Sequence, residues 1–86
     1  MYEMTQTSLD NLKPYLSSAD IDDGIARYTP LDYHNIFING EVVVEPVSMI
    51  EVSGNNVIFY GSEGIIDNGA TIDNIECAVY KQTRMI

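Results

Sequence analysis

The chain has 86 residues and an acidic composition, with thirteen Asp and Glu against four Lys and Arg and a formal net charge of −9. This length allows one hydrophobic core, so we expect a single domain over residues 1–86. A hydrophobic content of 45% is too high for a disordered polypeptide. Four basic residues are too few for a phosphate-binding footprint, which argues against direct binding of DNA or RNA.

The sequence also indicates a cellular compartment. Residues 1–5 lack the basic and apolar stretches of a signal peptide, and no apolar run is long enough to span a bilayer. The single cysteine, Cys77, excludes an internal disulfide framework. Anionic lipid would repel so acidic a surface. We therefore expect a cytoplasmic protein without membrane contact, located in the host-cell cytoplasm if a phage encodes it.

Residues 1–30 are expected to be helical. Leu9, Leu12 and Leu16 recur at the i, i+3, i+7 spacing of one helix face, after a possible cap at Thr7 or Ser8. Pro14 lacks an amide donor and clashes with the preceding turn, so this first helix should be short, kinked or split.

A second helix is expected in the remainder of this region, capped by Ser17 or Ser18. Three carboxylates would then lie in its first turn, where the helix dipole favours negative charge. Thr29-Pro30 would end the helix, because a residue before proline avoids helical geometry. The apolar stripe of this helix would consist of Ile21, Ile25 and Tyr28.

From residue 33 onward the apolar residues alternate, as strands require. Asn39-Gly40 is a strong hairpin signal, and Pro46 should lie at a sheet edge or at a bend. The glycines of segment 61–71 indicate a longer loop. The expected strands cover residues 36–38, 41–45, 47–52, 57–60 and 72–81.

These signals together predict an α+β fold. Two short N-terminal helices in residues 1–30 would pack on a four- to five-stranded antiparallel meander sheet in residues 33–82.

No pattern in the chain predicts catalysis, and none predicts a metal or cofactor site. Counted from Asp20, the acidic stretch misplaces both the glycine and the glutamate of a calcium-binding EF-hand loop. His34 and Cys77 are the only residues for a cysteine–histidine pair, and Cys77 alternates with apolar residues, as core cysteines do. We therefore expect no enzymatic activity and no cofactor.

The acidity favours a basic protein as the partner. In size and charge the chain resembles small phage-encoded inhibitors, among them DNA mimics that block restriction enzymes, uracil-DNA glycosylase or CRISPR effectors, although no residues align. The resemblance implies an anti-CRISPR- or anti-restriction-like inhibitor that docks its carboxylates on the nucleic-acid-binding groove of its target, where phosphates normally lie. The candidate contact residues are Asp20, Asp22, Asp23, Asp32, Glu41, Glu45, Glu51, Glu63 and Glu76.

The alternative hypothesis is a structural or assembly module that forms a homodimer or adds an edge strand to a partner. Segment 42–44 and the apolar end Met85-Ile86 would supply the contacts. In this hypothesis the acidity maintains solubility, and Glu41 and Glu45, on one face of a strand, protect the edge from aggregation.

Overall fold

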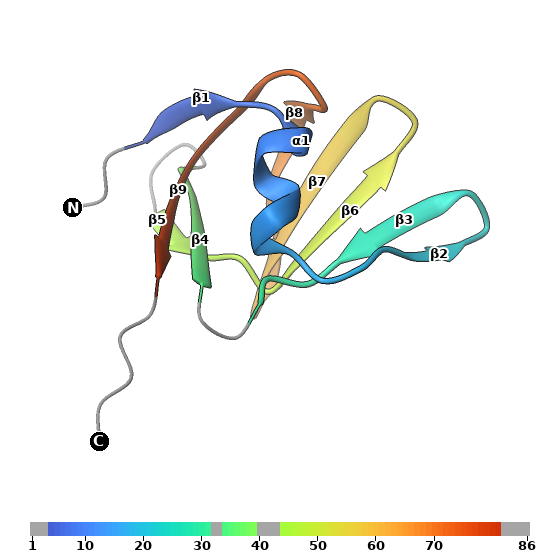
Figure 1. The fold of residues 1–86 in the computed structure, drawn as a ribbon, viewed down its shortest axis with the longest axis horizontal. Coiled ribbons are helices and arrows are strands. Elements are labelled where there is room, and N and C mark those ends of the chain that lie inside the picture. Colours follow the sequence, from blue (N-terminus) through green and yellow to red (C-terminus); the bar gives the residue numbers. More distant parts are fainter. Residues whose placement is uncertain (1–3, 32–33, 40–43, 82–86) are drawn as a thin grey trace.

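The computed structural model describes residues 4–31, 34–39 and 44–81, which form two antiparallel sheets and one short helix (Figure 1). The predicted pair of helices on a single sheet is therefore wrong. The four-stranded sheet has the order β1 (Thr5–Thr7), β9 (Ile75–Lys81), β4 (His34–Asn39) and β5 (Val44–Pro46). The five-stranded sheet has the order β2 (Asp20–Asp22), β3 (Ile25–Tyr28), β6 (Met49–Ser53), β7 (Asn56–Gly61) and β8 (Gly64–Thr71).

The segment expected to form the second helix is the β2–β3 hairpin. Asp22 pairs with Ile25, and the two residues between them, Asp23 and Gly24, have φ angles of 54° and 78°. A type I′ turn requires positive φ at both central positions, and Asp-Gly adopts this geometry at low cost. This local preference outweighs the helical spacing of three apolar residues.

The residues flanking the hairpin extend the same ribbon. The Ser17 amide donates to the Thr29 carbonyl at 2.8 Å, and the Ser17 hydroxyl accepts a hydrogen bond from the Thr29 amide at 3.0 Å. Leu16 forms a further antiparallel bridge with Pro30. Ser17, expected to cap a helix, instead ties together the base of a two-stranded ribbon.

Substitution of Gly24 distinguishes the hairpin from a helix by the sign of its effect. We expect Gly24→Ala to lower the free energy of unfolding by about 1–2 kcal/mol, because a Cβ disfavours positive φ. In a helix the same change would raise stability by up to about 1 kcal/mol. Urea denaturation followed by circular dichroism measures the difference. Gly69→Ala is the control, since Gly69 has no positive φ and its Cβ would meet only Asp67 Oδ1 at 3.7 Å; equal losses in the two variants would contradict the turn assignment.

The first predicted helix is present and is short, as expected from Pro14. α1 (Leu9–Leu12) is followed by one turn of 3-10 helix at Lys13–Tyr15, so the α-helical geometry ends beside Pro14. Leu9, Leu12 and Leu16 are all buried. Figure 1 shows α1 lying between the two sheets, where these side chains join the core.

The core lies between the sheets and draws on both of them. Between β5 and β6 the chain passes from one sheet to the other within two consecutive residues: the Val47 amide donates to Ile36 O at 2.7 Å, and the Ser48 amide donates to Tyr60 O at 2.7 Å. The buried cluster comprises Leu9, Leu12, Leu16, Ile36, Ile38, Val47, Ile50, Val57, Phe59, Ala70, Ile75 and Cys77.

Two further expectations concern the hairpins. The glycine-rich segment expected to be a loop is largely strand β8, which pairs with β7 through a register irregularity. Asn39 pairs with Val44. Residues 40–43 lie outside the described part of the chain, and they include Gly40 of the predicted turn and most of the predicted strand 41–45. Pro46 ends β5, which is an edge strand, as predicted.

Candidate protein-binding surface

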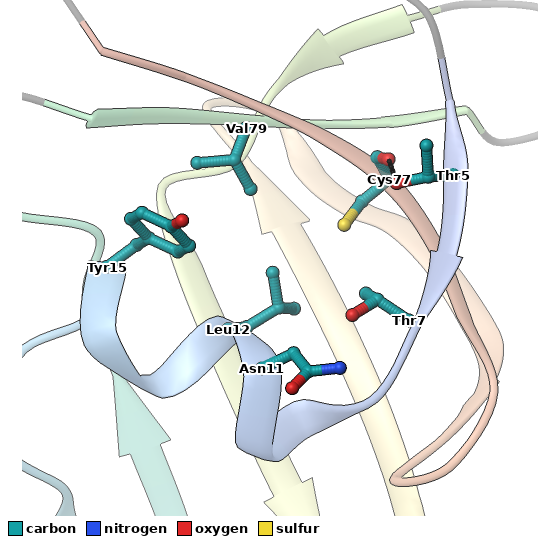
Figure 2. Close-up of a pocket in the computed structure, with 7 residues that line it drawn as sticks. All are labelled: Thr5, Thr7, Asn11, Leu12, Tyr15, Cys77 and Val79. Atoms are coloured by element: carbon teal, nitrogen blue, oxygen red, sulfur yellow. Dashed lines mark hydrogen bonds between the residues drawn. The ribbon is translucent and has the colours of Figure 1, made fainter.

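A pocket of about 290 Å³ lies between β1, the N-terminal helical turns and β9 (Figure 2). The buried Cys77 borders it, and burial raises the pKa of the Cys77 thiol to about 11, so that the thiol is protonated and poorly nucleophilic at neutral pH. Its walls include the described residues Thr5, Thr7, Asn11, Leu12, Tyr15, Cys77 and Val79, and none of these seven side chains is charged.

The strand register separates the two residues considered for a catalytic pair. On β9, Cys77 pairs with Ile38, whereas Lys81 pairs with His34. Four residues of extended strand correspond to about 13 Å, which is too far for a thiol–imidazole hydrogen bond. The His34 ring instead packs against Tyr15, with ring centroids 5.0 Å apart. Across the described ranges, no group of three potential ligand side chains could hold a metal ion.

The β2–β3 hairpin concentrates three of the predicted contact residues. Asp20, Asp22 and Asp23 are all exposed, and β2 is the outermost strand of its sheet. Because strand side chains alternate, Asp20 and Asp22 lie on the same face, about 7 Å apart along the strand. Within the described residues, neither Asp20 nor Asp23 has a basic side chain within ion-pair distance. We call these three residues the hairpin acids.

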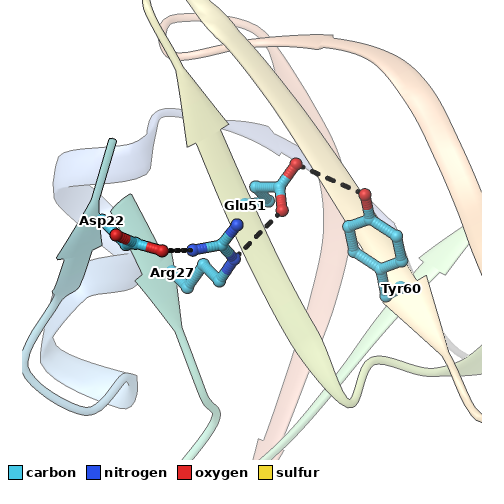
Figure 3. Close-up of polar contacts among 4 residues, drawn as sticks. All are labelled: Asp22, Arg27, Glu51 and Tyr60. Atoms are coloured by element: carbon cyan, nitrogen blue, oxygen red, sulfur yellow. Dashed lines mark hydrogen bonds and ion pairs between the residues drawn. The ribbon is translucent and has the colours of Figure 1, made fainter. Parts of the chain in front are cut away.

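Arg27, Glu51 and Tyr60 form a polar network across three neighbouring strands of the five-stranded sheet (Figure 3). Arg27 Nε donates to Glu51 Oε2 at 3.2 Å, and Tyr60 Oη donates to Glu51 Oε1 at 3.3 Å. The Arg27 guanidinium also reaches Asp22 Oδ2 at 4.0 Å. Burial and the adjacent Glu51 carboxylate raise the pKa of Tyr60.

This network changes the interpretation of Glu51, which was expected to contact a partner. Its side chain is only 15% exposed, and both of its oxygens already accept hydrogen bonds from Arg27 and Tyr60. Glu51 is therefore placed to orient its neighbours. Sequence reasoning missed Arg27 and Tyr60, because their pairing with Glu51 depends on the register of β3, β6 and β7.

Among the described residues, the other predicted contact carboxylates lie on elements outside the β2–β3 hairpin. Glu76 is exposed on β9, in the other sheet, where Gln6 Nε2 donates to it at 3.5 Å. Glu63 is exposed in the turn between β7 and β8. Glu45 is half-buried and pairs with Ile38, whose side chain belongs to the core. Asp32 and Glu41 lie outside the described residues.

Comparison with known proteins gives no family assignment. No family model matches the chain, and no significant match was found among curated proteins or solved structures. No helix in the described part of the chain is long and apolar enough to cross a membrane. The fold and the surface together define a small two-sheet β-protein that displays an acidic hairpin at the edge of one sheet.

Proposed function

We propose that this chain is an acidic protein-binding inhibitor that docks on the basic nucleic-acid-binding groove of a target protein and occupies the place of nucleic-acid phosphates. The observation that carries the proposal is the β2–β3 hairpin, where three exposed carboxylates lie within four residues. Its type I′ turn and its pairing with β6 through β3 hold these charges at defined spacing. A groove that binds phosphates would find several carboxylates already arranged on a strand.

Electrostatic attraction gives this interaction a recognisable salt dependence. The net charge of −9 steers the chain toward cationic surfaces, and added salt screens that attraction. Charges at the rim of an interface act mainly on the association rate and on its salt dependence. The complex should therefore form at low salt, weaken steeply at high salt, and exclude DNA or RNA from the target.

Charge reversal of the hairpin tests the proposal. We expect Asp20→Lys/Asp22→Lys to weaken binding at least about tenfold, because two attractive contacts become repulsive. The tagged protein is used to capture cellular proteins at low and high salt, and each captured protein is then tested for competition between this chain and a DNA or RNA oligonucleotide.

The matched control is Asp10→Lys/Asp73→Lys, which changes net charge equally at exposed positions that are outside the hairpin and were not among the candidate contact residues. Circular dichroism verifies that both double variants remain folded. The proposal is wrong if the two variants bind equally well, or if the captured protein binds this chain and its nucleic acid simultaneously.

A further inference from the structure

The outward side of the five-stranded sheet carries a row of apolar side chains. Met49 pairs with Tyr60, and Tyr60 pairs with Ile65, so these three side chains form one line across β6, β7 and β8. Ile58 lies on the same side, two residues from Tyr60 along β7. Buried Ile50 and Phe59 alternate with these residues and point to the core, which places the apolar row on the opposite surface.

No element within the described ranges covers this row. Ile65 is 57% exposed, and Met49, Ile58 and Tyr60 are partly exposed. Figure 1 shows α1 and the four-stranded sheet on the other side of β6 and β7. Adjacent exposed apolar residues of this kind mark interaction surfaces more often than isolated ones do.

The apolar row continues into the acidic hairpin across the same surface. Tyr60 contributes its ring to the row and its hydroxyl to Glu51, which binds Arg27, which in turn approaches Asp22. In β2, β3 and β6 the charged residues of this surface give a net charge of −2, three acids less one base. These residues are Asp20, Asp22, Glu51 and Arg27.

We infer that this surface binds a partner protein whose contact site is apolar on one side and basic on the other. The apolar row would bury against the apolar part, while the hairpin acids face the Lys and Arg residues. A second copy of this chain does not fit, because two such negative surfaces would meet and Arg27 is already paired with Glu51 and Asp22. The inference rests on the proposed function and adds a second, uncharged component to recognition.

Two synthetic peptides of equal length and charge separate the apolar contribution to binding from the electrostatic one. In one peptide Lys alternates with Leu, and in the other Lys alternates with Ser. Each is titrated into the isotopically labelled full chain, and amide chemical shifts report where it binds. We expect both peptides to shift the hairpin amides, and the Lys/Leu peptide alone to shift those around Ile58 and Ile65 and to bind about tenfold more tightly.

Two variants provide the control. Ile65→Ser should remove most of the advantage of the Lys/Leu peptide, whereas Ile21→Ser should retain it, because Ile21 is 71% exposed but lies on the opposite side of its sheet. Equal affinity of the two peptides, shifts specific to the Lys/Leu peptide on a surface away from Ile58 and Ile65, or equal effects of the two variants would overturn the inference while leaving the proposed function in place. If neither peptide shifts the hairpin amides, the charge-based function itself is wrong.

Discussion

Phe59→Ala is expected to lower the free energy of unfolding by about 3–5 kcal/mol. Phe59 lies in β7 and is the largest fully buried side chain among the described residues, with 0% exposure. Truncation would remove its apolar contacts within the buried cluster and leave a cavity that the close-packed surroundings fill only in part. Domains of this length are stable by roughly 4–13 kcal/mol, so the loss would consume a large share of the total.

Ile58→Ala is the matched control in the same strand. Ile58 is the neighbour of Phe59 but points to the outward surface and is partly exposed, so its truncation should cost less than about 1.5 kcal/mol. Urea denaturation measured by circular dichroism gives both values. Similar losses at the two positions would contradict the alternation of β7 between core and surface.

Apolar alternation was sufficient to locate the central strands but not to divide them between two sheets. The expected strands at 36–38, 47–52, 57–60 and 72–81 overlap β4, β6, β7 and β9. Alternation identifies which side chains share a face, but it does not specify which strands become neighbours. At one of the places where the chain changes sheet, between β5 and β6, the consecutive amides of Val47 and Ser48 bond to different sheets, and no local sequence pattern indicates such a change.

The error at the β2–β3 hairpin arose from two signals of unequal strength. Three apolar residues at i, i+4 and i+7 are compatible with a helix, but a strand–turn–strand segment accommodates the same spacing. Asp23-Gly24 carries the same turn preference that was recognised at Asn39-Gly40. Given more weight, that dipeptide would have predicted the hairpin and placed Asp20 and Asp22 together on a strand.

The candidate surface was only partly accessible to sequence reasoning. Acidity and the local clustering of the hairpin acids are visible in the sequence, although their arrangement was assigned to a helix. The ion pair between Arg27 and Glu51 cannot be read from the sequence. The two residues are 24 positions apart and meet only through the pairing of β3 with β6. The apolar row has the same origin, since Met49, Tyr60 and Ile65 become neighbours only when β6, β7 and β8 pair.

Stability is expected to fall as pH rises from 9 to 11, by up to about 3 kcal/mol, because of Cys77. Burial raises the pKa of this thiol from its ordinary value of 9.0 to about 11. In that interval the unfolded chain loses the thiol proton and the folded chain retains it, so rising pH favours unfolding. The contribution is fully present below pH 9 and is lost as pH passes through about 11.

Urea midpoints measured across this interval for the wild type and Cys77→Ala test the assignment. The variant should start from a lower stability, because it loses part of a buried side chain, but its stability should fall less with pH. Tyr60 should also make stability fall as pH rises, since burial and Glu51 raise its pKa above the ordinary value of 10.0. The Tyr60→Phe variant removes this contribution and so distinguishes it from that of Cys77. If the wild type and Cys77→Ala lose stability at the same rate, alkaline unfolding does not originate at Cys77. If Cys77→Ala makes stability depend less on pH between 9 and 11, the thiol is buried in solution. This result agrees with the packing of Cys77 in the core between β9 and α1.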